Sequence, residues 1–319
     1  MALTLEQYAA YLDAHGASWP AVPPLERPKA KPHLPALDDV RAVTWSVYGT
    51  LLAISTGELL FEHPQKFIMD LALEKTVQEY KMWGSMSRKP GQPSEYMGQL
   101  YAKALFELRT APSPGEKHPE IVAERAWENI VKKLLQKDYK FDAGFFGSLN
   151  EYARKIAFFF HASLQGTACY DGAAAALAAV KERGLAQGLI ADGQSFTLVQ
   201  LQRGLAAQDA AAKVGTLLDK DLRTLSFEVG SKKPSERLFK HALAALEARG
   251  IEPSQVLHVG SRIAQDVAPA KKLGMRTALF AGDKASLGAT ADQLKDPATR
   301  PDALLTELTQ IVDVIAPSG

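Results

Sequence analysis

The sequence has one cysteine, almost no net charge and no long apolar run. Cys169 has no partner for an internal disulfide, which is typical of a reducing compartment. A formal net charge of +1 is not the excess of positive charge that binding to nucleic acid or an anionic membrane requires. The apolar run 156–160 is far shorter than the roughly 20 residues of a membrane span, and no segment resembles a secretory signal. We therefore expect a cytoplasmic protein with neither nucleic-acid nor membrane partners.

The composition is otherwise that of an ordinary globular protein. With 46% hydrophobic and 23% charged residues, the 319-residue chain can bury a sizeable core, and its length suggests about two domains. His63, His118, His161, His241 and His258 do not repeat at the short spacing of metal ligands. The histidines therefore predict no metal site.

Residues 1–40 are expected to form an arm outside the main fold. Leu5, Tyr8 and Leu12 recur at helical spacing and predict one short amphipathic helix. Six prolines between Pro20 and Pro35 then favour an extended chain. Two hypotheses remain for the arm: it wraps its own protein, or its PxxP-like spacing binds a partner.

Two patterns follow along the chain. Apolar residues at three-and-four spacing predict helices over 58–83, 95–109, 118–136 and 146–164, with no strand signal between them. After residue 171, helices alternate with short apolar strands, which predicts right-handed βαβ units and a parallel sheet. The expected helices are 173–183, 195–207, 234–250, 264–273 and 304–314; the expected strands are 41–45, 188–191, 225–229, 256–259 and 277–280.

The first of these strands leads into the most informative stretch. Gly49 and Thr50 break it into a tight loop, and open α/β sheets bind ligands beyond the carboxyl ends of their strands. The run 46–51 (Ser-Val-Tyr-Gly-Thr-Leu) resembles the first motif of the haloacid dehalogenase (HAD) superfamily, in the form with tyrosine at its third position. Members of this superfamily hydrolyse substrates through an aspartate nucleophile. Ser46 occupies the position of that aspartate, and Tyr48 either packs in the mouth of the site or takes part in chemistry.

The resemblance covers roughly residues 40–315 and implies an α/β fold. It implies a HAD-like Rossmannoid parallel sheet with helices on both faces, plus an inserted all-helical cap domain. The corresponding domains are a core at 41–57 and 166–319, a cap at 58–165 and the arm at 1–40.

The second motif of the family is a strand that ends in a serine or threonine, which binds the phosphoryl or carboxylate group. Here the strand ends in Ala191, Asp192 and Gly193. Ala191 offers no hydroxyl, and a negative charge at Asp192 would oppose an anionic substrate. Alternatively, Asp192 caps the helix that starts near Ser195.

The third and fourth motifs follow in the family's order. Lys233 precedes a proline and matches the lysine that neutralises charge around the nucleophile. Ser261 stands where phosphatases of the family hold Mg²⁺ with an aspartate, and Asp266 matches the second acid of that motif. Metal-free haloacid dehalogenases are similar in having serine at this position. Asp266 and Asp192 are then the only candidate metal ligands, so we expect no cofactor, with Mg²⁺ as the single alternative.

These residues lead to two hypotheses about function. In the first, the protein is a HAD-like hydrolase impaired by Ser46 and Ser261, and it binds a small anion or a protein partner. In the second, it is an active phosphatase or 2-haloacid dehalogenase-like hydrolase with another nucleophile, such as Asp192 or a Ser46–Lys233 pair. The site-equivalent residues are Ser46, Tyr48, Asp192, Lys233, Ser261 and Asp266, and the anion would contact Thr50, Gly193, Lys233 and Arg262. We expect Ser46, Lys233 and Asp266 to converge beneath the cap.

Overall fold

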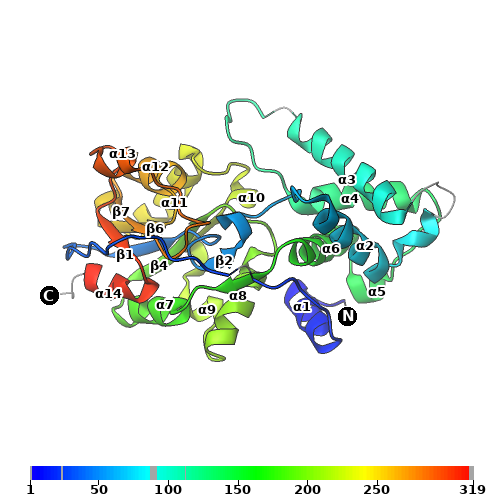
Figure 1. The fold of residues 1–319 in the computed structure, drawn as a ribbon, viewed down its shortest axis with the longest axis horizontal. Helices are drawn as coiled ribbons and strands as arrows, with labels where there is room; N and C mark the ends of the chain where they lie inside the picture. Colours follow the sequence, from blue (N-terminus) through cyan, green and yellow to red (C-terminus); the bar gives the residue numbers. More distant parts are fainter. Residues whose placement is uncertain (1, 23, 87–91, 112, 316–319) are drawn as a thin grey trace.

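A six-stranded parallel sheet forms the centre of the computed structural model, which describes residues 2–22, 24–86, 92–111 and 113–315 (Figure 1). Its strand order is β5-β4-β1-β6-β7-β8. The bounds are β1 Ala42–Trp45, β4 Ala186–Ala191, β5 Arg223–Leu225, β6 Val256–Gly260, β7 Arg276–Phe280 and β8 Ala303–Leu305. This architecture confirms the expected α/β class.

The central strands are buried on both faces, which explains their continuous apolar sequences. Every residue of β1 and β6 is buried, and two apolar clusters cover the two faces of the sheet. On one face lie α7 (Ala173–Glu182) and α14 (Ile311–Val314). On the other lie α11 (Glu236–Glu247) and α12 (Ala268–Lys272). The sheet is therefore the rigid support for the loops at its carboxyl edge.

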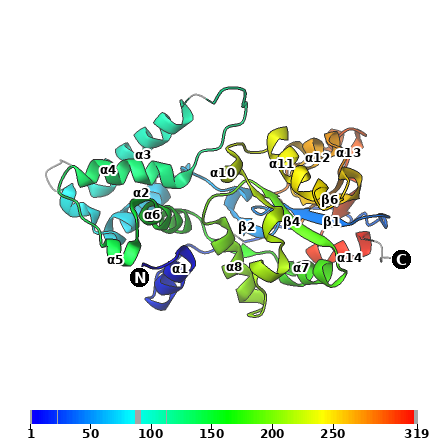
Figure 2. The ribbon, with the colours of Figure 1, turned by 180° about the vertical axis from the view of Figure 1, so that it is seen from behind.

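The helices of the cap form a separate layer beside the sheet (Figures 1 and 2). They are α2 Lys66–Glu79, α3 Pro93–Arg109, α4 Ala123–Leu135, α5 Ala143–Phe146 and α6 Leu149–Leu164. Their apolar cluster is built on Trp127, Tyr101 and Phe160, and it extends to Phe196 beside α8 (Thr197–Gln208) of the core. An antiparallel pair, β2 (Leu52–Ile54) and β3 (Thr167–Cys169), joins this layer to the sheet. None of the described helices has both the length and the apolar character that a membrane crossing needs.

The N-terminal residues contain the predicted helix and a long extended stretch. Helix α1 (Leu5–Ala14) begins with a capping box between Thr4 and Gln7. Its buried side chains belong to the apolar cluster of the cap helices. The extended part lies against the sheet domain, where His33 pairs with Leu304 of β8. The domain limits 1–40, 41–57, 58–165 and 166–319 themselves stay a prediction.

Three predicted elements differ from the structure. The strand expected at 225–229 is β5, which ends at Leu225 where its pairing with Ala191 ends; the chain then forms the single helical turn α10 (Ser226–Val229). The helix expected at 304–314 begins with the edge strand β8, which pairs with β7, and only its last residues form α14. The helix expected from residue 58 begins at Lys66, because the preceding segment connects the core to the cap and contains Pro64.

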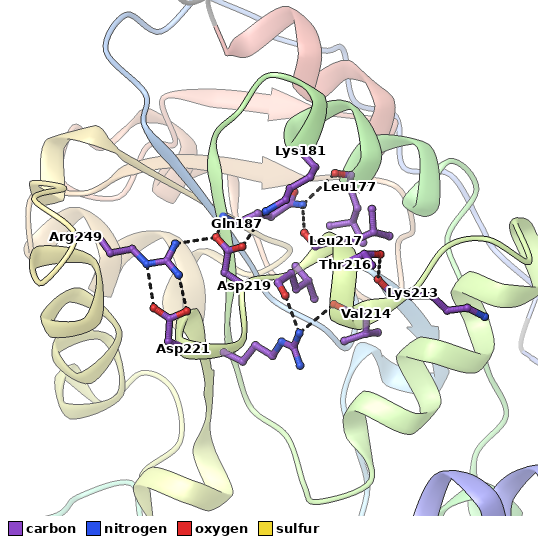
Figure 3. A network of polar contacts seen from close by, with 12 residues as sticks. Leu177, Lys181, Gln187, Lys213, Val214, Thr216, Leu217, Asp219, Asp221 and Arg249 are labelled. Atoms are coloured by element: carbon purple, nitrogen blue, oxygen red, sulfur yellow. Dashed lines mark hydrogen bonds and ion pairs between the residues drawn. The ribbon is translucent and has the colours of Figure 1, made fainter.

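A polar network closes the edge of the sheet opposite the carboxyl ends of the strands (Figure 3). Asp219 accepts hydrogen bonds from Lys181 and Arg249, each at 2.9 Å. Arg249 also donates to Asp221 through Nε and Nη2, and the backbone amide of Gln187 at the start of β4 donates to Asp219. This network fixes connecting loops at the edge remote from the motif residues.

Candidate functional site

A cavity of about 240 Å³ lies at the carboxyl ends of β1, β4 and β6. Its wall combines core residues from all four motifs with residues of the cap segment. Ser46 follows β1, Asp192 follows β4, and Ser261 follows β6. The residues lining the cavity are Ser46, Tyr48, Gly57, Glu58, Leu59, Phe61, Glu120, Asp192, Gly193, Gln194, Lys232, Lys233, Ser261, Arg262, Gln265 and Asp266.

Ser46 is held in place by an extension of the sheet. Its backbone amide donates to the carbonyl of Val259 at 2.8 Å, which continues the pairing of β1 with β6. The loop then turns at Gly49, whose φ of +78° is unfavourable for other residues. A Cβ at Gly49 would also lie 2.9 Å from Ser261 Oγ, so the two loops approach too closely for a side chain. The Ser46 hydroxyl accepts a hydrogen bond from Lys233 Nζ at 2.7 Å.

Lys233 and Asp266 form a buried ion pair beside Ser46. Only 4% and 3% of their side chains are exposed. The other carboxylate oxygen of Asp266 accepts from the backbone amide of Arg262 at 2.9 Å. Burial, the largest single effect, would raise the pKa of Asp266, but the charge of Lys233 and the neighbouring His258 together outweigh burial and hold this pKa well below the ordinary value. The structure thus brings Ser46, Lys233 and Asp266 together, and their catalytic roles stay predictions.

His258 lies behind this pair in the middle of β6. Its Nδ1 is 3.0 Å from the Thr44 hydroxyl, and its Nε2 is 3.7 Å from Asp266, which is too long for a hydrogen bond. Burial lowers the pKa of His258, so the ring is neutral. Our sequence analysis considered His258 only as a candidate metal ligand and gave it no other role. A polar residue within a fully buried strand was the signal that could have found it.

Tyr48 is an anchor of the loop. Its hydroxyl donates to Gln200 Oε1 at 2.6 Å and lies 3.0 Å from the hydroxyl of Thr197, both on α8. Burial raises its pKa far above the ordinary value, so the phenol stays protonated. Of the two hypotheses for Tyr48, these contacts favour packing over chemistry.

Asp192 does not cap the following helix, so that alternative is wrong. Helix α8 begins at Thr197, and its N-cap residue Phe196 makes no side-chain cap. The carboxylate of Asp192 instead accepts from the backbone amide of Lys233 at 2.8 Å, and burial raises its pKa. The amide of Gly193 donates to the Ser226 hydroxyl at 2.9 Å. Gly193 therefore lines the cavity with an amide that is already engaged.

The other two residues expected to bind an anion, Arg262 and Thr50, do not offer a free donor to the cavity. Arg262 donates to Glu58 at 3.2 Å and to the carbonyl of Thr56 at 2.5 Å, which fixes the segment entering the cap. Thr50 is completely buried, is not part of the cavity wall, and its hydroxyl has no partner among the described residues. An anion could reach Arg262 only in competition with Glu58.

Glu120 is a cavity residue that sequence reasoning missed. It comes from the cap segment, and its carboxylate accepts from the Ser226 hydroxyl at 2.5 Å. Burial raises the pKa of Glu120 to about 7, and the negative charge of Asp192 adds to the effect. No local sequence pattern marks this residue, because only the folding of the cap over the core brings it to the site.

The donors at this site do not suit Mg²⁺. This ion prefers oxygen ligands that include one or two carboxylates. Asp266 uses both oxygens on Lys233 and Arg262, and Ser46 and Ser261 supply only neutral hydroxyls. Within the described ranges, no group of three or more His, Cys, Asp or Glu residues is arranged to hold a metal.

Comparisons with known proteins agree with this fold. A family model described as haloacid dehalogenase-like hydrolase matches residues 41–274. Phosphoserine phosphatase of Thermus thermophilus is 28% identical over 183 residues, which are 57% of this chain and 65% of that protein. Glyceraldehyde 3-phosphate phosphatase of Pyrococcus furiosus is 28% identical over 144 residues, which are 45% of this chain and 53% of that protein. The chain spans less than two thirds of the length of either relative.

A solved structure also aligns with most of the chain. The crystal structure of a HAD phosphatase from Thermococcus onnurineus aligns with 85% of this chain and 96% of that one, at 18% identity and a TM-score of 0.45. At this identity and TM-score, neither a function nor a site residue is transferred from that structure.

Proposed function

Because the chain belongs to the haloacid dehalogenase-like hydrolase family, we propose that it binds a small anion in its cleft without forming the family's aspartyl ester. A carboxylate at position 46 could attack a phosphorus or carbon centre and leave an ester. Ser46 offers a neutral hydroxyl instead. The contact between Ser46 and Lys233 is the observation that carries this proposal.

A serine becomes a nucleophile when a neighbouring base removes its proton. The group within hydrogen-bond distance of Ser46 Oγ is the side-chain nitrogen of Lys233, which is paired with Asp266. An ammonium in such a pair has no lone pair with which to accept a proton. It donates to Ser46, and the hydroxyl hydrogen of Ser46 is left free for a ligand.

The hydrogen-bond donors available to a ligand in the cavity include the hydroxyl hydrogen of Ser46, the hydroxyl of Ser261 and the ammonium of Lys232. Among the described residues, none accepts a hydrogen bond from these three groups. Hydroxyls and an ammonium suit the oxygens of a phosphate or carboxylate group. The names of the two relatives, both phosphatases of phosphorylated metabolites, support a phosphate-bearing ligand.

The same contact favours a second candidate, a hydrolase in which Ser46 is the nucleophile and Lys233 its base. Serine and lysine form such pairs in other enzymes. This mechanism requires Lys233 to lose its proton while Asp266 remains beside it as a carboxylate. The two candidates therefore differ in whether turnover occurs at all.

The test is an assay of pure protein against phosphate monoesters and 2-haloacids, with and without Mg²⁺, beside the Ser46→Ala and Lys233→Ala variants. Calorimetry with inorganic phosphate would accompany it. We expect no turnover, and phosphate binding that weakens in Ser46→Ala. Turnover that both substitutions abolish would overturn the proposal in favour of the serine hydrolase. Absence of both turnover and phosphate binding would contradict the binding role.

A further inference from the structure

Residues 2–22 and 24–37 of the arm contact the cap at one end and the core at the other. At the cap end, α1 buries Tyr8 and Leu12 in the apolar cluster of the cap. The Tyr8 hydroxyl donates to Glu79 of α2 at 3.0 Å. The Trp19 ring lies edge-on to Phe159 of α6, with 5.6 Å between the ring centres. The first part of the arm therefore belongs physically to the cap.

The second part of the arm is fixed to the core. His33 pairs with Leu304 through two backbone hydrogen bonds of 2.9 and 2.8 Å, so the arm adds to the edge strand β8. The amide of Leu37 donates to the carbonyl of Val314 at 2.8 Å. Such backbone pairing is specific in register and makes this end a firm attachment.

Between these ends, the arm crosses the junction of the cap and the core. Asp13 forms an ion pair with Arg203 of α8 at 2.6 Å, and the Arg203 guanidinium lies 5.3 Å from the centre of the Trp19 ring. Both views place α1 beside α6 and α8 (Figures 1 and 2). This cluster joins the arm to the core at the point where the cap begins.

The crossing lies directly over Gly166, in one of the two segments that connect cap and core. A Cβ at Gly166 would meet the carbonyl oxygens of Pro20 at 2.3 Å and Ala21 at 2.6 Å, and its nearest neighbours are all arm backbone. The φ of Gly166 is not positive, so the close approach of the arm is what requires glycine here. The arm backbone therefore packs on the connector itself.

The neighbouring residue joins the two connectors. The side-chain nitrogen Nε2 of Gln165 donates to Ser55 Oγ at 2.7 Å, and its side-chain oxygen Oε1 accepts from the backbone amide of Leu60 at 2.7 Å. Any rotation of the cap must change backbone angles in these connectors, because they are the covalent links between the two bodies. A segment packed against them restrains that rotation.

We propose that the arm is an intramolecular clamp that holds the cap against the core and thereby controls entry to the cleft. Movement of the cap would require the arm to leave Gly166 or to release one of its two attachments. The clamp does not depend on which chemistry the cleft performs, so it can be tested apart from the proposed function.

Hydrogen–deuterium exchange of the full chain tests the clamp. Gly166→Ala pushes the arm backbone away, and we expect exchange in segments 55–60 and 164–169 to rise about tenfold. Gly215→Ala is the matched control, since a Cβ at Gly215 meets nothing within 4 Å, and its exchange should equal that of the wild type. Asp13→Asn removes the ion pair to Arg203 and should raise the same exchange by a smaller factor, about two- to fivefold.

Two results would overturn the clamp. One is faster exchange of the arm near Pro20 in Gly166→Ala with unchanged exchange in both connectors. The other is unchanged exchange in every variant. If circular dichroism shows that Gly166→Ala unfolds the whole protein, the Asp13→Asn variant tests the clamp instead. Unchanged exchange of segments 55–60 and 164–169 in that variant would then overturn the clamp.

Discussion

The ammonium of Lys233 and the carboxylate of Asp266 form an ion pair from which water is almost excluded. The lysine follows β5 and the aspartate follows β6, so the pair links two loops behind Ser46. Each charge is tolerated in this buried position because the other is present. The pair therefore sets both the stability of the site and the charge that Ser46 experiences.

Removal of one partner should destabilise the protein strongly. In Lys233→Met, the carboxylate of Asp266 remains buried and unpaired, and we expect a loss of about 3–5 kcal/mol in the free energy of unfolding. The double variant Lys233→Met/Asp266→Asn removes both charges and should recover most of that loss. Urea denaturation measures all three proteins. Equal losses in the single and double variants would show that the pair does not act as a unit.

Tyr48→Phe should lower stability and leave ligand binding unchanged. The substitution removes the donor to Gln200 Oε1 and leaves that buried oxygen unsatisfied, at a cost of about 1–3 kcal/mol. The Tyr48 hydroxyl is engaged on α8 and is not among the free donors of the cavity. Denaturation and phosphate calorimetry check both parts. A fall in phosphate affinity as large as that of Ser46→Ala would identify Tyr48 as a ligand contact.

The motif residues could be predicted because parallel strands bring their carboxyl ends to one edge of the sheet. Ser46, Asp192 and Ser261 each follow a buried strand, and a buried apolar run is a strong local signal. The short strand β5 was expected at 225–229, where only its last residue lies, and β8 was predicted as the start of a helix. Each has three residues, and its limits depend on pairing with a neighbouring strand rather than on its own sequence.

The remaining site residues depend on contacts between distant segments. Glu120 reaches the cavity only because the cap segment packs on the loops after β4 and β5. There the Ser226 hydroxyl donates a hydrogen bond to the Glu120 carboxylate. The ion pair between Arg262 and Glu58 likewise depends on the segment that enters the cap. No spacing within the sequence encodes either contact, so pattern analysis could identify the fold and the core motifs but not the cap side of the site.

Restoration of two carboxylates should create a metal site. In Ser46→Asp/Ser261→Asp, the cavity gains the oxygen ligands that Mg²⁺ and Mn²⁺ prefer. We expect the double variant to bind Mn²⁺, as followed by electron paramagnetic resonance, and the wild type to bind at least about tenfold more weakly. The matched Ser46→Asn/Ser261→Asn variant controls for size without charge. Equal Mn²⁺ affinity in the wild type and the aspartate variant would show that the two serines are not what keeps a divalent metal from this site.

Anion binding should weaken as pH rises through about 7. Glu120 is protonated below its pKa of about 7 and charged above it, and it faces Asp192 and Lys232 across the cavity. Above pH 7 the wall therefore carries one more negative charge, which repels an anion. Sulfate is the appropriate probe because its own charge is constant in this range. We expect its affinity to fall on the order of tenfold between pH 6 and 8.

Glu120→Gln tests the origin of this pH dependence. The amide keeps the shape of the carboxyl group but cannot ionise, so sulfate affinity should become nearly constant between pH 6 and 8. Stability gives an independent check with a definite sign. The pKa of Glu120 is raised in the folded protein, so the folded state binds more protons than the unfolded state between about pH 4.5 and 7, and stability falls as pH rises through that window. Glu120→Gln should remove this slope; an unchanged slope would assign the effect to another group.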